Sequence, residues 1–308
     1  MSPRAWLSMA ITAALWGASY MFIKVALDGG LSEGFIICAR TLLGAVVLVP
    51  LGLRAGALPL LLARKGWTVA LALAQVIVPF GLITFGENHV PSALAGILVA
   101  SAPLFVAILA VRLDPEERSR GWGLVGVVLG MAGVVLLFGV DLSGDSQTIV
   151  GGLMILGAGL SYAFAVLIVK RGFTGVPPVG VAASTMVLSA VAWLPVALAS
   201  LPTRGPGADA TLSLVALGAG GTGVAFLFFY RSIAEVGPAR ASVVAYVAPA
   251  FAVIYGVTLL GEDLTIGTIA GLALILAGSW LAAQSRLPAV LSRSAPSRSS
   301  APAPARAR

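Results

Sequence analysis

The sequence predicts an all-α integral membrane protein of ten transmembrane helices, arranged as two inverted five-helix repeats. Three observations support this prediction: the composition, the spacing of the apolar runs and an internal duplication. The 308-residue chain is 59% hydrophobic and only 10% charged, whereas roughly a quarter of the residues of a soluble domain are charged. Too few polar side chains are present to cover a water-exposed surface, so most of the chain must face lipid.

Apolar runs bounded by charged or turn residues divide the chain into ten segments. Each is close to the roughly 20 residues that a helix needs to span about 30 Å of hydrocarbon. The runs lack the polar alternation of membrane β-barrel strands. The expected helices cover residues 5–27, 34–53, 67–86, 92–112, 122–140, 150–169, 178–200, 211–230, 239–259 and 266–285.

The fourth and ninth expected helices belong to a duplicated stretch. Val90–Glu117 aligns with Val236–Asp263 without a gap, and Pro103 and Pro249 are 146 residues apart. Because each copy holds five helices, an odd number, the second copy begins on the opposite side of the membrane, and duplication of this kind is common in transporters. The expected repeats are residues 5–140 and 150–285, followed by a disordered Ser/Ala/Pro/Arg-rich cytoplasmic tail over 287–308.

Basic residues predict the orientation. With the N-terminus in the cytoplasm, 16 of the 19 Lys and Arg residues lie in cytoplasmic loops or in the tail, as the positive-inside rule requires. Arg204 is then the one basic residue outside, and Lys24 and Arg40 lie within helices. The predicted location is the cytoplasmic membrane, with both termini in the cytoplasm. The N-terminus also resembles a secretory signal, but cleavage would remove a helix that has a counterpart in the second half.

The net charge and the rare residues exclude several classes of function. A net charge of +7 would suggest a nucleic-acid partner in a soluble protein, but here it reflects membrane orientation. Cys38 and His89 are the single cysteine and histidine, so neither a cysteine cluster nor a multi-histidine metal site is possible. We therefore expect no cofactor, no metal and no nucleic-acid partner, and we interpret His89 as a turn residue.

Several motifs follow one another along the chain, and the last of them has a second copy. They are LWG at Leu15–Gly17, Arg40, GENHVPSALAGILVASAPLF at Gly86–Phe105, and GLVGVVLGMAGVVLL at Gly123–Leu137 with its partner IAGLALILAGSWL at Ile269–Leu281. With these motifs the chain resembles the EamA-type transporters of the drug/metabolite transporter superfamily. The resemblance implies ten helices, cytoplasmic termini, and export or exchange of a small metabolite through a central cavity.

The charged residues inside the expected helices are the first candidates for a site. Arg40 lies about 9 Å inside its helix, and a charge at that depth normally faces a cavity or a partner. Glu87, at the end of the third expected helix, is the nearest candidate partner. The second copy has nothing like Glu87–Asn88–His89 at Ile233–Glu235, so symmetry assigns this triplet no role. Lys24 is close enough to a helix end to snorkel.

Two prolines and two acids mark the duplicated helices. Pro103 and Pro249 each remove a backbone donor in mid-membrane, which predicts either broken helices that line the substrate path or static kinks that help packing. Glu116 and Glu262 end the same helices on opposite faces of the membrane. They either fix helix depth as solvated acids or form gating salt bridges.

Polar and aromatic residues complete the expected substrate cavity. Trp and Tyr also occur in interfacial belts, so both interpretations stay open for some of these side chains. The candidates are Trp16, Tyr20, Gln75, Ser101, Tyr162 and Tyr246.

Glycines at helical spacing predict close packing. Gly126 and Gly130 in the fifth expected helix, and Gly271 and Gly278 in the tenth, have the spacing of residues that let helices approach. We expect these helices to be scaffold, with a dimer face as the alternative. The run Gly218–Gly223 either brings backbone close to a substrate or serves packing.

The predicted function is secondary transport of a small organic metabolite or drug by alternating access, with export as the direction that the family resemblance implies. The alternatives are a channel or uncoupled facilitator, and an intramembrane enzyme, for which no paired carboxylates or Cys/His couple lie within a helix. No phosphate loop for primary pumping is present. The expected partners are a small-molecule substrate, the lipid bilayer, and a coupling proton or counter-substrate, with the protein a monomer or a homodimer.

Overall fold

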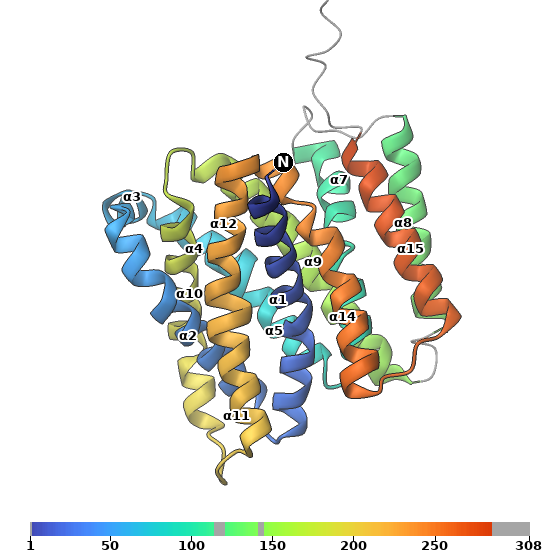
Figure 1. The fold of residues 1–308 in the computed structure, drawn as a ribbon, viewed down its shortest axis with the longest axis horizontal. Coiled ribbons are helices and arrows are strands. Elements are labelled where there is room, and N and C mark those ends of the chain that lie inside the picture. The colour runs from blue at the N-terminus through green and yellow to red at the C-terminus, as the bar shows by residue number, and fades with distance from the viewer. Residues whose placement is uncertain (1, 114–120, 141–144, 285–308) are drawn as a thin grey trace, which may run out of the picture.

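The fold is a bundle of helices packed side by side (Figure 1). A computed structural model describes residues 2–113, 121–140 and 145–284. Within these ranges the chain forms helices and short connections, and it contains no strand, which confirms the predicted all-α class. Glu116 and the predicted tail over 287–308 lie outside the described residues.

The first half of the chain forms five apolar helical segments. Ser2 and Ser32 begin the first two, because each hydroxyl accepts a hydrogen bond from a backbone N–H three residues on, that of Ala5 at 3.1 Å and that of Phe35 at 3.4 Å. The elements are α1 (Pro3–Asp28), α2 (Glu33–Arg54), α3 (Ala57–Ala63), α4 (Lys65–Ala72), η1 (Leu73–Ile77), α5 (Val78–Gly86), α6 (Ser92–Val99), α7 (Ala102–Leu113) and α8 (Trp122–Val140).

The second half repeats this order. Its elements are α9 (Ser146–Gly172), α10 (Pro178–Ala199), α11 (Ala208–Val215), η3 (Ala216–Val224), α12 (Ala225–Val236), α13 (Pro238–Ala241), α14 (Val244–Leu260) and α15 (Ile266–Gln284). In the described residues, nine helical spans are long and apolar enough to cross a membrane, and α14 is a shorter apolar helix of 17 residues. Each of the ten predicted helices therefore has a counterpart, whereas the short α3 was not predicted.

A π-helical segment interrupts the third membrane-spanning helix and the eighth. In the third, η1 lies between α4 and α5; in the eighth, η3 lies between α11 and α12. Shifted by the 146 residues that separate the repeats, η1 falls at 219–223, inside η3. A π-helix leaves backbone groups out of the usual hydrogen-bond register and often marks a functional site. The two halves of the chain thus contain a π-helical segment at corresponding positions.

The fourth and ninth membrane helices are both interrupted, but at different depths. In the fourth, α6 ends at Val99 and α7 begins at Ala102, so Pro103 lies in the first turn of α7, where proline is tolerated. The buried Ser101 hydroxyl donates to the Leu98 carbonyl oxygen at 2.6 Å. In the ninth, the interruption precedes Val244, and Pro249 lies inside the continuous α14. The predicted break at a proline is therefore found in one of the two copies.

The most extensive helix contacts between the two halves of the chain are those of α1 with α14, of α2 with α10, and of α8 with α15. Glycines permit two of these approaches. A Cβ atom at Gly17 would lie 2.6 Å from the Ala248 carbonyl oxygen, and one at Gly126 would lie 2.6 Å from that of Gly278. In Figure 1, α8 and α15 lie side by side at one edge of the bundle, consistent with the scaffold interpretation of their glycines.

Candidate functional site

Arg40, on α2, is buried among groups from three other elements. Its exposed fraction is only 7%. The Nε atom donates a hydrogen bond to the Thr222 hydroxyl oxygen at 3.0 Å, and the guanidinium carbon lies 3.8 Å from the centre of the Phe80 ring, a cation–π distance. Within the described residues, the terminal Nη1 and Nη2 atoms donate no hydrogen bond. The side chain is thus held by the hydrogen bond at Nε and by the contact of the guanidinium plane with the Phe80 ring. Its two terminal amino groups make no hydrogen bond within the described residues.

The glycine-rich η3 segment brings Thr222 to Arg40. A Cβ atom at Gly218 would lie 2.7 Å from that of Leu43 and 3.1 Å from the Arg40 carbonyl oxygen. Side chains there would push η3 away from α2. The Thr222 hydroxyl also donates to the Leu217 carbonyl oxygen at 3.0 Å, five residues back, which is π-helical spacing. The glycine run therefore serves close packing of η3 against α2. This packing brings the Thr222 hydroxyl to the arginine.

Glu87 is a buried carboxylate without a hydrogen-bond partner. It follows the span Lys65–Gly86 directly, its exposed fraction is 0%, and neither carboxylate oxygen has a partner within the described residues. Lys24 donates instead to the Glu87 backbone carbonyl oxygen at 3.3 Å and forms an ion pair with Asp28 at 3.7 Å. Burial raises the pKa of the Glu87 carboxyl well above its ordinary value, and the positive charges of Arg40 and Lys24 oppose this shift.

The predicted direct pairing of Arg40 with Glu87 is not found. Within the described residues, no ion pair of 4.0 Å or less joins them, because Thr222 and Phe80 hold the guanidinium in another position. The two charges are still close enough to influence each other, and both influence the hydroxyl of Tyr20. The site therefore keeps a buried guanidinium and a buried carboxyl group near each other but not in direct contact.

Tyr20 and Tyr162 lie beside these charges. Tyr20 on α1 and Tyr162 on α9 both pack on the apolar cluster that contains Ile23 and Ile83, and each interacts electrostatically with Arg40. A Cβ atom at Gly96 would lie 3.3 Å from the Tyr20 ring, so α6 also contacts this tyrosine closely. We call the following set the central polar cluster: Tyr20, Arg40, Glu87, Tyr162 and Thr222.

The structure distributes the other predicted cavity residues more widely. Trp16 packs on Phe226 and Phe229, with ring centres 5.8 and 4.9 Å away. Tyr246 lines a separate apolar hollow between α14 and α15. Gln75 is half-buried in η1, Ser101 is buried at the α6–α7 interruption, Pro103 is half-buried and Pro249 is buried. Sequence reasoning thus identified four members of the central polar cluster. It missed Thr222, which the glycine run around it could have indicated.

Glu262 makes a contact that sequence reasoning did not anticipate. Its carboxylate oxygens accept hydrogen bonds from the backbone N–H groups of Ser92 at 2.7 Å and Ala93 at 2.9 Å, the first two residues of α6. Gly256 leaves room for it, since a Cβ atom there would collide with a carboxylate oxygen of Glu262 and would lie 3.2 Å from its carboxyl carbon. The acid caps a helix of the other repeat, where the N-terminal partial charge favours an anion. The residue is half-buried and, within the described residues, it forms no salt bridge.

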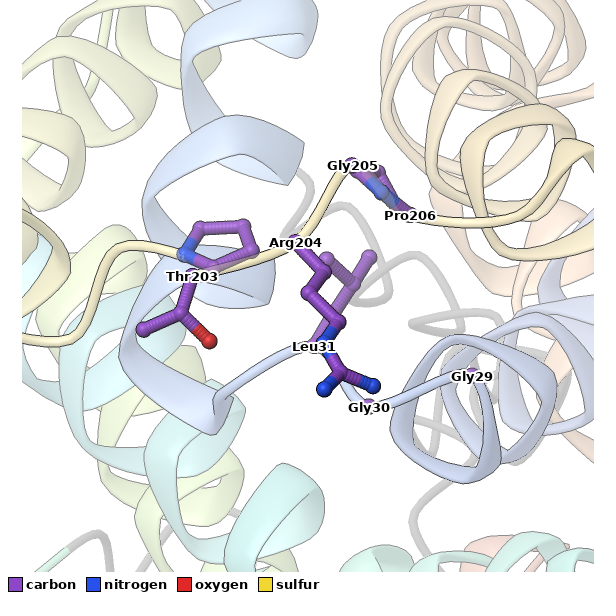
Figure 2. A pocket seen from close by; sticks show the side chains of 8 residues that line it. Gly29, Gly30, Leu31, Thr203, Arg204, Gly205 and Pro206 are labelled. Atoms are coloured by element: carbon purple, nitrogen blue, oxygen red, sulfur yellow. The ribbon is translucent and has the colours of Figure 1, made fainter.

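A shallow hollow of about 250 Å³ lies between the α1–α2 and α10–α11 connections. Its lining includes Gly29–Leu31 and Pro202–Pro206, and Figure 2 shows the Arg204 side chain extending toward Gly30 and Leu31. The hollow shares no lining residue with the central polar cluster. It is a surface feature at the end of the bundle that lies at the bottom of Figure 1.

Long apolar helices around a buried set of charged and hydroxyl groups define a multi-pass membrane protein with a polar interior. The chain belongs to the EamA-like transporter family, whose sequence profile matches residues 4–139 and 149–284. The suspected family is thereby confirmed.

Relatives cover almost the whole chain. An inner membrane transporter of Escherichia coli K12, YedA, is 30% identical over 82% of this chain and 81% of its own length. A probable terminal-alkyne amino-acid exporter of Streptantibioticus cattleyicolor is 28% identical over 91% of this chain and 93% of its own. One solved crystal structure covers 94% of this chain and 98% of its own, with a TM-score of 0.64 and 21% identity, and so shares the fold.

Proposed function

We propose that the protein is a secondary transporter that exports a small organic metabolite or drug across the cytoplasmic membrane. The observation that carries this proposal is the central polar cluster, in which Arg40 of the first half binds Thr222 of the second at 3.0 Å. A site built jointly by two repeats changes when the repeats move against each other. Alternating access between inverted repeats depends on such a site.

The energetic argument concerns the cost of the buried charges. An arginine at the centre of a membrane helix costs about 2.5–3.5 kcal/mol on insertion scales, and ionisable residues in the membrane interior usually mark a substrate or ion pathway. Arg40 lies within α2, and Glu87 directly follows the span Lys65–Gly86. Arg40 and Glu87 are both buried, and no ion pair joins them within the described residues. Binding of a polar solute by these two side chains would account for their presence in the interior of the protein.

Orientation and direction complete the proposal. The charge distribution of the sequence supports cytoplasmic termini, with the α1–α2 and α10–α11 connections outside. The name of the exporter from Streptantibioticus cattleyicolor supports the outward direction. A coupling proton or a counter-moving solute would supply the driving force.

The test is a metabolite-wide export screen of an overexpressing strain against a deletion strain, followed by flux in proteoliposomes. We expect saturable flux of at least one solute, accelerated by unlabelled solute on the opposite side. Arg40→Gln should abolish it, whereas Arg204→Gln, which changes an arginine at the bundle end, should not. Linear flux without counterflow would indicate an uncoupled facilitator or channel, and conversion of the solute would indicate an enzyme.

A further inference from the structure

The apolar hollow between α14 and α15 lies apart from the central polar cluster and has a volume of about 390 Å³. Sites for small molecules and cofactors have volumes of about 300–1,000 Å³. The two helices follow each other in the chain but pack on different neighbours, α14 mainly on α1 and α6, and α15 mainly on α8 and α7. The space between them is lined by Val243, Tyr246, Leu276, Ala277 and Trp280.

This hollow opens toward the bilayer. Trp280 has an exposed fraction of 55%, and Val243 and Ala277 are also exposed. Trp280 lies four residues before the end of α15 at Gln284, or about 6 Å along the helix, where tryptophan commonly lies at the level of the lipid headgroups. A molecule that fills the hollow therefore enters it from the lipid.

The corresponding space in the first half of the chain is filled by protein. Shifted by the 146 residues that separate the repeats, Val243 and Trp280 fall on Ile97 and Val134. Both of these residues are buried in an apolar cluster that also contains Ile155 of α9. The second half leaves open a place that apolar side chains occupy in the first, which indicates an apolar occupant from outside the chain.

Arg240 lies at the membrane-surface end of the same hollow. The Val243 N–H donates to the Arg240 carbonyl oxygen at 3.2 Å, and the Tyr246 N–H donates to that of Val243 at 3.0 Å. Hydrogen bonds of this i to i+3 kind bring every third side chain into one row. Arg240 is therefore in line with two residues that line the hollow. It is exposed, and it forms no ion pair within the described residues.

Going beyond the proposed transport function, we propose that this hollow binds an anionic phospholipid of the bilayer. One acyl chain occupies the space between α14 and α15, and Arg240 binds the phosphate of the headgroup. A guanidinium suits this role because two parallel N–H groups match two phosphate oxygens. Basic pockets between membrane helices on the cytoplasmic side bind anionic headgroups in this way. The orientation that the basic residues support places the hollow in the cytoplasmic leaflet.

The first test is lipid titration of the purified, delipidated full-length protein in detergent, followed by native mass spectrometry. Dioleoyl phosphatidylglycerol should bind roughly fivefold or more tightly than dioleoyl phosphatidylcholine, the ratio that one basic side chain near an anionic surface contributes. Arg240→Gln should bring this ratio close to one. Arg204→Gln, at the other end of the bundle, should leave it unchanged. Equal binding of the two lipids by the wild type, or an unchanged ratio in Arg240→Gln, would overturn the proposal.

The same titration tests the acyl-chain part of the site. Val243→Trp should fill the hollow and weaken the binding of phosphatidylglycerol several-fold. Val128→Trp is the matched control, because Val128 is exposed on α8 and does not line the hollow. Glycerophosphoglycerol, the headgroup without chains, should not compete. Competition by this compound at lipid concentrations, or protein dimers that form in place of lipid binding, would overturn the proposal.

Fluorescence then locates the bound chain, since bromine atoms on an acyl chain quench a nearby indole. Brominated phosphatidylglycerol should quench the wild type more strongly than brominated phosphatidylcholine does. Trp280→Phe should remove this difference, because Trp280 is the tryptophan that lines the hollow. A difference that persists in Trp280→Phe would place the lipid elsewhere on the protein and overturn the assignment.

Discussion

At the scale of single residues, Arg40 depends on one neutral hydroxyl for its orientation. Thr222 accepts from Nε at 3.0 Å and is itself fixed by donation to Leu217. Phe80 holds the guanidinium face at 3.8 Å. The guanidinium is therefore oriented by a neutral hydroxyl and an aromatic ring, without an ion pair to an acid. In a structural ion pair, by contrast, the carboxylate partner would occupy the terminal amino groups.

We predict that Thr222→Val, which preserves shape but removes the acceptor, lowers flux several-fold in the proteoliposome assay. The unsatisfied Nε should also cost about 1–3 kcal/mol of stability, measured as a lower thermal midpoint in detergent. Thr211→Val is the matched control, since Thr211 is exposed and bonds only to the backbone one turn earlier. If both variants transport alike, Thr222 does not orient the arginine.

Glu87 makes stability depend on pH in a defined direction. Burial raises its pKa well above the ordinary value, so the folded protein favours the protonated acid. This stabilisation is complete below the pKa of the unfolded chain and is lost as the pH rises through the folded pKa. Arg40, Lys24, Asp28 and Glu262 are the charged groups that act on this carboxyl.

We therefore predict that raising the pH lowers the thermal midpoint of the wild type more than that of Glu87→Gln. At low pH the two midpoints should converge, because protonated glutamate and glutamine are both neutral. The measurement is the thermal midpoint of each protein in detergent, without solute, across a pH series. Parallel curves over the whole series would show that Glu87 does not titrate in the folded protein.

The sequence was sufficient to select Arg40 and Glu87, because a charged residue within or directly after a long apolar run can be recognised without a structure. It was not sufficient to assign their partners. Predicting Thr222 required knowing that glycines bring η3 against α2, a tertiary contact that no local pattern encodes. The hypothesis of a direct Arg40–Glu87 pair relied on helix order and could not account for a competing hydroxyl.

At the scale of elements, Glu262 holds the start of α6 from the end of α14. Both of its hydrogen bonds reach backbone groups that α6 cannot satisfy internally. One carboxylate thus links the end of the ninth membrane helix to the start of the fourth.

We predict that Glu262→Ala lowers stability by about 0.5–2 kcal/mol, the usual cost of losing an N-cap, seen as a reduced thermal midpoint. Gly256→Ala should produce a similar loss, because the added methyl group would meet the Glu262 carboxylate and Ala93. Glu235→Ala is the control, since that acid forms an i,i+4 ion pair with Arg231 near the end of α12, and such surface pairs contribute little. An unchanged midpoint for Glu262→Ala would remove the capping role.

We predict that replacement of the two prolines affects transport to different extents. Pro103 lies just after the α6–α7 interruption, whereas Pro249 lies within a continuous helix. Pro103→Ala should favour a continuous fourth helix and reduce flux more than Pro249→Ala, while both variants insert normally, since alanine supplies the missing donor and favours helix. Membrane protein levels and counterflow rates are the measurements. Equal flux in the two variants and the wild type would make both prolines static packing residues.

The ten helices were predictable because the apolar run lengths match the bilayer. The π-helical segments were not, since η1 contains the same kinds of residue as the α-helices around it, and the glycine run of η3 indicates close packing but not π-helical hydrogen bonding. The short α3 was also missed, because seven residues are too few for a spanning segment to stand out.

At the scale of the whole molecule, the odd number of helices in each repeat makes the expected topology testable. Reporter fusions after Arg54, Asp145, Arg171 and Arg286 should report cytoplasm, outside, cytoplasm and cytoplasm. The physical reason is the concentration of 16 of 19 basic residues on one side in this arrangement. An external signal from the Arg286 fusion would contradict the inverted arrangement of the repeats.

The unequal π-helical segments have a consequence for a carrier that works by exchanging the conformations of its repeats. In such a carrier the inward-facing and outward-facing forms would be equal in free energy only if the two repeats were identical. The π-helical segments η1 and η3 contain five and nine residues, and the hydroxyl that binds Arg40 lies on the longer one. In the proposed mechanism this difference contributes to a preferred resting side for the empty carrier, and such a bias would determine from which compartment it loads first.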